Sequence, residues 1–225
     1  DGDRLIGVDL TDGTCDVMLF SDAGKAVRFA EDDVRPMGRE ARGVRGMALE
    51  DGQQVVSMLV VRDESGSVLT ATEAGYGKRT PVAEFTRHGR GTKGMIAIQT
   101  SRRNGRLVAA CLVQPGDEII LISQNGVLIR TSVDDIREMG RSTQGVTLMR
   151  TGAEDKVVAL AMVEKKTELA LDRIAVHDTA FLNHFRTIRK KKVRPILVDD
   201  DLCLCIAGNP VIPACIGRLS GPGPE

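Results

Sequence analysis

The stretch ATEAGYGKRTPVAEFTRHGRGTKG, residues 71–94, combines glycine turns with five Lys or Arg residues and only two acidic residues. Its spacing recurs on both sides. The glycines that follow an S/T-x-x-G turn are Gly24, Gly75 and Gly126, which are equally spaced, 51 residues apart. This period predicts the fold more directly than any single motif does, because self-similarity at a fixed step is typical of repeat architectures.

Other positions keep the same 51-residue step. The members of each set are all apolar, all glycine or all arginine. The sets are Arg28, Arg79 and Arg130; Val34, Phe85 and Ile136; Gly38, Gly89 and Gly140; Arg39, Arg90 and Arg141; Gly43, Gly94 and Gly145; Met47, Ile98 and Met149; and Val56, Leu107 and Val158. Apolar, glycine and arginine positions that keep the same step over three copies are not expected by chance. The sequence therefore predicts repeats without insertions.

The register also places the ends of the array. The opening DRLIGVDL lies where a closing strand is expected, because Leu5 precedes Val56 by 51 residues. We therefore expect the chain to begin inside an earlier repeat, and Asp1 in place of Met suggests a fragment. The register is lost after about Glu164, which divides the chain into a repeat region, residues 1–164, and a tail, residues 165–225.

Each repeat is patterned as β-structure. The first contains DVMLFS (16–21), KAVRFA (25–30), VRGMAL (44–49) and VVSMLVV (55–61), which are apolar and β-branched runs between glycine turns. The connection DDVRPMGREARG (32–43) is interpreted as a helical turn followed by a loop. Four strands per repeat predict an all-β, propeller-like array: about three complete blades and the closing strand of a preceding one. Neighbouring blades must stack to bury their apolar faces.

Composition excludes several classes of protein. Aromatic content is 3% with no Trp, which argues against a stacking platform for single-stranded nucleic acid. The sequence contains no apolar run of about 18 residues and no secretory signal, so no membrane contact is expected. The cysteines have irregular spacing and predict no disulfide framework; they are Cys15, Cys111, Cys203, Cys205 and Cys215.

The net charge is zero, so any anion site must arise from uneven charge distribution. Each repeat carries a G-R-x-x-x-G loop, at 38–43, 89–94 and 140–145. Equivalent cations on a curved rim are complementary to a duplex backbone, so we predict DNA contacts at Arg28, Arg39, Arg42, Lys78, Arg79, Arg90, Lys93, Arg102, Arg103, Arg130 and Arg141. The structural glycines are Gly24, Gly43, Gly75, Gly94, Gly126 and Gly145. Solvated arginines, or arginines paired with Glu40 or Glu138, remain the alternative.

Three other functions are weighed against DNA binding. GYGKRT lacks the Walker spacing and precedes no helix, which argues against a nucleotide pocket. No Ser/His/Asp, paired-carboxylate or metal pattern recurs, so neither a catalytic residue nor a metal ligand is assigned. A protein–protein adaptor would expose apolar or aromatic anchors, which are scarce in this sequence.

The segments NGVLIRT, GYGKRT, RGTKG, MGRSTQGV and VMLFSDAGKAVRF resemble the C-terminal domain of bacterial DNA gyrase A, over about residues 1–164. The resemblance implies a β-pinwheel, a propeller-like disc of six blades whose strands are exchanged between neighbours. It implies that a basic rim wraps duplex DNA and supports ATP-driven negative supercoiling by a type IIA topoisomerase. The rim contacts carried over are Arg28, Lys78, Arg79, Arg90, Lys93, Arg130 and Arg141.

The resemblance also implies partners and a location. They are duplex DNA, gyrase B and a second copy of gyrase A, bound through a region N-terminal to this one, in the bacterial cytoplasm at the nucleoid. No cofactor is expected in this chain, because ATP and Mg²⁺ belong to the holoenzyme. The family's first-blade box QRRGGKG is absent from this sequence. The related subunit of topoisomerase IV, which positions DNA for decatenation or relaxation, therefore stays open as an alternative.

The tail resembles none of the repeats. Residues 169–191 predict a helix with Leu171, Ile174, Phe181 and Phe185 on one apolar face. Residues 198–217 are apolar but interrupted by Pro210 and Pro213, which predicts an irregular segment. The basic run RKKKVR, residues 189–194, is interpreted as a solvated charge run.

Overall fold

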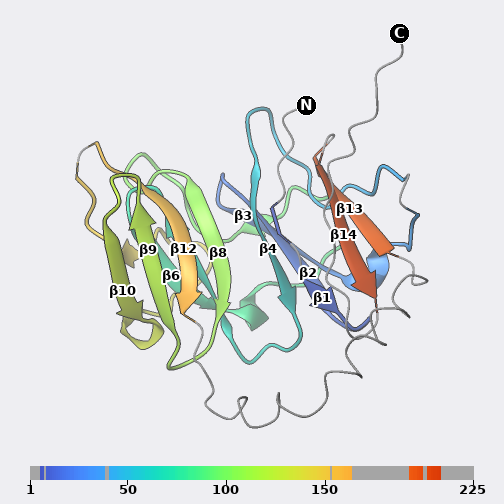
Figure 1. The fold of residues 1–225 in the computed structure, drawn as a ribbon, viewed down its shortest axis with the longest axis horizontal. Helices are drawn as coiled ribbons and strands as arrows, with labels where there is room; N and C mark the ends of the chain where they lie inside the picture. Colours follow the sequence, from blue (N-terminus) through green and yellow to red (C-terminus); the bar gives the residue numbers. More distant parts are fainter. Residues whose placement is uncertain are drawn as a thin grey trace, which may run out of the picture.

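The computed structural model describes residues 6–7, 9–38, 41–152 and 154–163, together with the strand paths of residues 193–199 and 202–208. Each repeat contains two strands, a 3₁₀ turn and a closing strand, and the second and third repeats add a two-residue strand before the closing strand (Figure 1). The first repeat contains β2 (Asp16–Ser21), β3 (Lys25–Ala30), η1 (Glu31–Asp33) and β4 (Val55–Val61). The second contains β5 (Ser67–Thr72), β6 (Tyr76–Pro81), η2 (Val82–Glu84), β7 (Met95–Ile96) and β8 (Leu107–Val113). The third contains β9 (Glu118–Ser123), β10 (Leu128–Ser132), η3 (Val133–Asp135), β11 (Val146–Thr147) and β12 (Val157–Val163).

The all-β prediction is confirmed, and the described ranges contain no α-helix. The predicted runs 16–21, 25–30 and 55–61 coincide with β2, β3 and β4, but the predicted strand 44–49 is wrong: Met47 makes only an isolated bridge to Thr92 there. The predicted helical turn is the 3₁₀ turn that follows the second strand of each repeat.

Each complete blade takes its fourth strand from the following repeat. Blade 1 has the strand order β4-β2-β3-β7, and β7 belongs to the second repeat. Blade 2 has the order β8-β5-β6-β11, and β11 belongs to the third repeat. The antiparallel pair of Ala26 with Met95 in blade 1 is equivalent to the pair of Gly77 with Val146 in blade 2. The exchange of strands implied by the resemblance is confirmed.

Blade 3 consists of β12-β9-β10 and has three strands in the described part of the chain. The edge strands β4, β8 and β12 approach one another, since β8 contacts both of the others. The Ala110 amide of β8, for example, donates a hydrogen bond to Ser57 Oγ of β4 at 2.9 Å. Because the blades converge at this edge, their opposite edges, which carry the exchanged strands, form the outer perimeter.

Apolar clusters fill the spaces between blades. Between blades 1 and 2, Phe20 of β2 meets Phe85, with ring centroids 6.2 Å apart in an edge-to-face arrangement. Between blades 2 and 3, Leu69 and Leu121 pack with Ile136. Phe85 and Ile136 occupy the same repeat position, directly after the 3₁₀ turn. The recurrent apolar anchor of each repeat therefore packs one blade onto the blade before it.

The prediction of repeats without insertions is wrong at one loop. The closing strands begin at Val55, Leu107 and Val157, which pair with Ser21, Thr72 and Ser123. In the first and third repeats the equivalent of Leu107 is therefore Val55 or Val157, and not the predicted Val56 or Val158. The connection that precedes the closing strand is one residue longer in the second repeat, at 99–106, than at 48–54 and 150–156. The 51-residue register returns after each closing strand.

The tail differs from its prediction where it is described. β13 (Val193–Asp199) and β14 (Leu202–Gly208) form an antiparallel hairpin, where an irregular segment was predicted from residue 198 onward. Strand β14 also pairs in parallel with β1 (Leu10–Thr11). The predicted helix at 169–191 lies outside the described residues, as does Leu5 of the predicted opening strand.

Gly75→Ala tests the close approach of neighbouring blades. Gly75 has a φ of +76°, and an added Cβ would lie 2.0 Å from the carbonyl oxygen of Met149 in the next repeat. Gly52 has the same φ, but a Cβ there meets nothing within 4 Å. Both substitutions incur the left-handed backbone cost of about 1–2 kcal/mol.

Gly75→Ala also forces the third-repeat segment that follows β11 away from blade 2, so we expect it to lower the free energy of unfolding by about 2 kcal/mol more than Gly52→Ala does. Urea denaturation of both variants measures the difference. Equal losses would contradict the close approach.

Candidate nucleic-acid interface

The G-R-x-x-x-G loops stack along the outer perimeter. We call the stacked segments, residues 41–48, 88–99 and 139–149, the loop ridge. Each loop bonds to the segment before it, since the Ala48 amide donates to the Thr92 carbonyl at 2.9 Å. The equivalent bond joins the Gln99 amide to the Thr143 carbonyl at 3.0 Å. The ridge is therefore continuous from blade to blade.

The loop arginines fasten the steps of this ridge. Arg90 Nη1 donates to the Arg45 carbonyl at 3.2 Å, and Arg141 Nη1 donates to the Ile96 carbonyl at 3.3 Å. Arg90 Nε also donates to the Asp33 carbonyl at 3.0 Å. A guanidinium has five N–H donors, so each of these arginines keeps donors for an anion outside the ridge. Arg90 and Arg141 can therefore bond the neighbouring loop segment and contact an anion at the same time.

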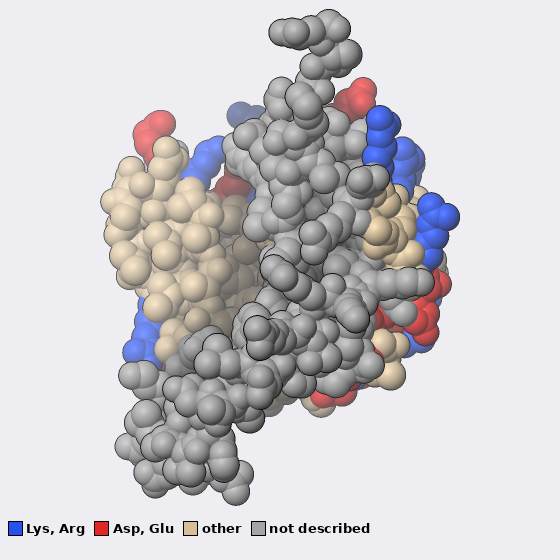
Figure 2. Space-filling view, turned by 45° about the vertical axis from the view of Figure 1, so that its right-hand side comes forward, with Lys and Arg blue, Asp and Glu red and all other residues tan. Residues whose placement is uncertain are grey.

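Exposed cations surround the ridge. Arg42, Arg90, Lys93, Arg102 and Arg103 are exposed, and Arg141 is half-buried. Lys93 Nζ lies 3.5 Å from Glu50 Oε1, an exposed pair that water and salt weaken. In Figure 2, Lys and Arg side chains gather along the right-hand edge of the molecule, with acidic side chains beside them.

The longer loop at 99–106 presents two of these cations. The buried Asn104 side chain accepts from the Ser101 amide at 2.7 Å and donates to the Gln99 carbonyl at 2.6 Å. The Arg103 guanidinium lies over the Tyr76 ring, 4.4 Å from its centroid. Arg102 has no partner among the described residues. The inserted residue thus adds a rigid basic loop beside the ridge.

Arg28 requires a correction. Its side chain is buried, and Nε donates to Asp16 Oδ2 at 2.8 Å, while Nη2 bonds Glu64 Oε1 at 2.6 Å. Nη1 donates to the Phe85 carbonyl of the next repeat at 2.9 Å. A guanidinium held on three sides inside the protein is not available to a phosphate. Arg28 links blades 1 and 2 instead.

Lys78 is also buried, contrary to the prediction of a rim contact. Its relative accessibility is 0%, and Nζ donates to the carbonyls of Gly140 and Arg141, each at 2.5 Å. Burial lowers the pKa of the Lys78 ammonium to about 8, while nearby Glu84 opposes this shift and Arg141 adds to it. Lys78 therefore connects β6 of blade 2 to the G-R-x-x-x-G loop of the third repeat, residues 140–145.

The remaining predicted cations differ in exposure. Arg79 is half-buried, and Nε donates to the Ile136 carbonyl at 2.7 Å, which repeats the contact of Arg28 with Phe85. Arg130, at the same repeat position, is exposed and pairs with Glu118 of its own blade. Arg39 lies outside the described residues.

Four of the six predicted structural glycines lie where the backbones of neighbouring repeats meet. A Cβ at Gly24 would meet the Ile98 carbonyl at 2.3 Å, and one at Gly94 would meet the Ala26 carbonyl at 2.4 Å. Gly75 and Gly145 make the equivalent approaches one repeat later, at 2.0 Å and 2.5 Å. Gly126 has a φ of +81° and a Cβ there would meet nothing within 4 Å. Gly43 has a φ of +86°.

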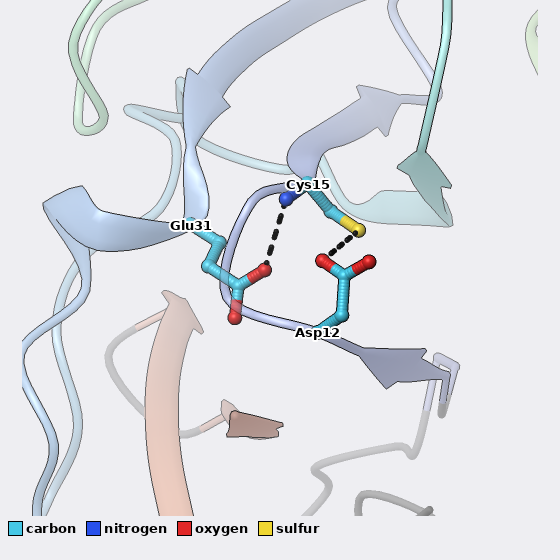
Figure 3. Close-up of side chains that lie close together, drawn as sticks. All are labelled: Asp12, Cys15 and Glu31. Atoms are coloured by element: carbon cyan, nitrogen blue, oxygen red, sulfur yellow. Dashed lines mark hydrogen bonds between the residues drawn. The ribbon is translucent and has the colours of Figure 1, made fainter. Parts of the chain in front are cut away.

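Sequence reasoning missed one cluster of possible metal ligands. Asp12, Cys15 and Glu31 lie close together at the start of blade 1 (Figure 3). Glu31 accepts hydrogen bonds from Thr11 Oγ1 at 2.8 Å and from the Gly13 and Cys15 amides at 3.1 and 3.2 Å. Burial raises the pKa of the Cys15 thiol, which donates to Asp12 Oδ1 at 3.3 Å. The Cys15 thiol is protonated, and the Glu31 carboxylate already accepts three hydrogen bonds. These hydrogen bonds hold the turn between β1 and β2 closed, and we call the three residues the clasp.

In the part of the chain that the structure describes, no helix is long and apolar enough to cross a membrane.

Comparison with known families identifies one that matches three segments of the chain. The C-terminal domain family of DNA gyrase, described as a β-propeller, matches residues 16–62, 66–110 and 117–164. Each segment corresponds to one repeat.

Relatives are identical to this chain at about half of the aligned positions. DNA gyrase A of Pseudomonas aeruginosa is 55% identical over 166 residues, which cover 73% of this chain and 18% of the relative. The Escherichia coli protein of the same name is 51% identical over 175 residues, covering 77% of this chain and 20% of the relative. The chain thus spans about a fifth of the length of these relatives.

Two solved structures have a similar fold. The C-terminal domain of DNA topoisomerase IV superposes with a TM-score of 0.66 at 28% identity, covering 70% of this chain and 49% of that one. The DNA gyrase A C-terminal domain superposes with a TM-score of 0.61 at 29% identity, covering 66% of this chain and 50% of that one.

Lys78→Met tests the buried ammonium through the pH dependence of stability. The pKa of Lys78 is lower in the folded chain, about 8, than its ordinary value of 10.5. Between these values the unfolded chain binds more protons than the folded chain, so the free energy of unfolding rises with pH. We expect this rise in the wild type to exceed that in Lys78→Met, by up to about 3 kcal/mol.

The free energy of unfolding of both proteins is measured from pH 7.5 to 10. Subtracting one from the other removes the contribution of the titrating groups that they share. A difference that stays constant with pH would show that Lys78 titrates normally.

Proposed function

Because the chain belongs to the DNA gyrase C-terminal domain family, we propose that its loop ridge binds and bends duplex DNA as a non-catalytic part of a type II topoisomerase. The observation that carries the proposal is the ridge itself. It is built from segments of three successive repeats, joined by backbone hydrogen bonds, and presents exposed cations at successive steps. A row of charges on a convex edge fits a polymer of phosphates better than it fits a single nucleotide.

The contacts that support this function form a smaller set than the sequence predicted. Exposed or half-exposed cations on or beside the ridge are retained: Arg42, Arg90, Lys93, Arg102, Arg103 and Arg141. Phosphate contacts of this kind set the position of DNA but read no bases, so selectivity comes from the bendability of the duplex. The ridge therefore acts as a curved guide for DNA.

The wider roles follow from the relatives. We infer that the whole protein uses ATP to introduce negative supercoils, with Mg²⁺ and ATP bound elsewhere in a complex of gyrase A with gyrase B. A cytoplasmic site of action at the nucleoid follows from the same inference. The relatives at 55% and 51% identity are gyrase A, which favours this parent, whereas the solved domains of topoisomerase IV and gyrase A, at 28% and 29% identity, do not distinguish the two.

Salt dependence of duplex binding tests the phosphate contacts. If six cations each bind one phosphate, log K should fall with log salt at a slope of roughly −5, and a slope shallower than about −2 would oppose the proposal. Arg42→Ala and Arg102→Ala should each reduce the slope by about one and weaken all sequences similarly.

Arg62→Ala is the matched control. Arg62 is exposed and follows β4, at the edge of blade 1 opposite the ridge, where it contacts the Leu10 carbonyl at 2.8 Å. The substitution removes the same charge from the protein but no ridge contact. An equal change in slope for Arg62→Ala would mean that net charge, and not the ridge, determines binding.

Chiral bending is a separate expectation, tested with nicked circular DNA that is ligated in the presence of the full chain. Wrapping around the ridge should shift the mean linking number relative to ligation without protein. An Arg42→Ala/Arg102→Ala double variant should reduce the shift. Tight, salt-dependent binding without a shift in linking number would support DNA binding and contradict wrapping.

A further inference from the structure

The second repeat departs from the other two in two features. The first is Tyr76, the single tyrosine of the chain, which holds the repeat position of Lys25 and Val127. The second is the additional residue in the connection at 99–106, which we call the insertion loop. Both departures belong to the same copy of the repeat, and they meet in the folded chain.

Tyr76 contacts an arginine of the insertion loop. The guanidinium carbon of Arg103 lies over the Tyr76 ring, 4.4 Å from the ring centroid. Tyr76 is the first residue of β6, and its backbone pairs with Thr147 of the exchanged strand β11. Hydrogen bonds with Arg103 and, second, with Thr147 lower the pKa of the Tyr76 hydroxyl. The ring therefore connects the loop arginine to a strand of the loop ridge.

The backbone of the insertion loop is fixed next to Arg103. Asn104 is fully buried, and its side chain donates to the Gln99 carbonyl at 2.6 Å and to the Gln144 carbonyl of the ridge at 3.3 Å. Its own carbonyl accepts a hydrogen bond from the Ala74 amide at 3.2 Å. Because Arg103 directly precedes Asn104, these bonds fix the position from which its side chain extends.

Charge beside the ridge is also concentrated in this loop. The corresponding connection of the first repeat, residues 48–54, has two acidic residues and no Lys or Arg, and that of the third, residues 150–156, has two of each sign. The insertion loop has three arginines and no acidic residue. Arg106 is paired with Asp22 at 2.6 Å, whereas Arg102 and Arg103 are exposed.

A guanidinium stacked on a ring keeps its ability to bind an anion. The ring covers one face of the group, while the N–H donors lie in its plane and point away from the ring, where a planar fork matches two phosphate oxygens. A side chain that is already held loses less conformational freedom on binding than one that rotates freely. Arg103 is held in this way, whereas Arg102 has no partner among the described residues.

We propose that Arg103, oriented by Tyr76, is the strongest phosphate contact of the loop ridge and anchors duplex DNA at the second repeat. Tyr76 is a positioning residue, because it fixes the plane of the Arg103 guanidinium and acts on DNA only through it. The inference rests on the proposed function, since its ligand is a phosphate of the duplex. It adds that one contact is formed in advance, by the two features that distinguish the second repeat.

Duplex affinity of the full chain at a fixed salt concentration tests the anchor. Arg102→Ala is the matched control, because it removes the same charge from the neighbouring position of the same loop. Arg103→Ala should weaken binding about fivefold more than Arg102→Ala does, since it also removes the contact that was formed in advance. Equal losses would overturn the proposal and leave DNA binding by the ridge in place.

A double-mutant cycle tests the role of Tyr76. Tyr76→Leu removes no charge but should weaken binding about fivefold, whereas Tyr76→Phe keeps the ring face and should bind within about twofold of the wild type. Tyr76→Leu should cause no further loss in the Arg103→Ala background, because Tyr76 acts only through Arg103. Wild-type affinity of Tyr76→Leu, or an undiminished loss in the Arg103→Ala background, would contradict the positioning role.

Arg103→Lys repeats the test without altering β6, and urea denaturation establishes that each variant is folded. The lysine keeps the charge but lacks the planar fork, so binding should weaken about threefold. Wild-type affinity of Arg103→Lys would overturn the proposal even if Tyr76→Leu failed to fold. A wild-type chain whose duplex binding is independent of salt would overturn both this inference and the proposed function.

Discussion

The fold depends on the close approach of a backbone carbonyl from one repeat to a glycine of its neighbour. At Gly24, Gly75, Gly94 and Gly145 the neighbouring oxygen occupies the space that a Cβ needs, so no other residue permits the approach. This approach lets a two-residue strand, which is too short to be stable alone, complete the sheet of the previous blade. Every blade junction, and therefore the course of the perimeter, follows from these four positions.

The same junctions explain why cations recur. A buried charge requires partners, and the 3₁₀ turn of the next repeat offers the carbonyls that Arg28 and Arg79 bond. Lys78 and Arg90 likewise bond carbonyls across a junction. Recurrence of a cation in a repeat protein thus records contact between repeats as well as contact with a ligand. Exposure separates the two roles.

Strand order and repeat length could be predicted because they depend on local patterns: glycine turns, β-branched runs and a constant step. The rim glycines could be predicted for the same reason. The burial of Arg28 and Lys78 could not, because it depends on a turn or loop contributed by the following repeat. The insertion at 99–106 escaped detection because Leu107 matches an apolar position in either register, and only the pairing of Thr72 with Leu107 fixes it. The clasp of Asp12, Cys15 and Glu31 carries no spacing signal, since Glu31 joins it from the end of β3.

Rigid junctions decide which partner bends. The ridge steps are fixed by backbone hydrogen bonds such as Ala48 to Thr92 and Gln99 to Thr143, together with packed cores on both sides. Smoothly bending 20–30 base pairs of duplex costs on the order of 1–6 kcal/mol. Breaking a blade junction would cost at least as much, because removing one buried aromatic anchor such as Phe85 alone costs about 3–5 kcal/mol. On the proposed function, duplex DNA bound along several ridge steps therefore adopts the curvature of the protein, and the spacing of the exposed cations sets its path.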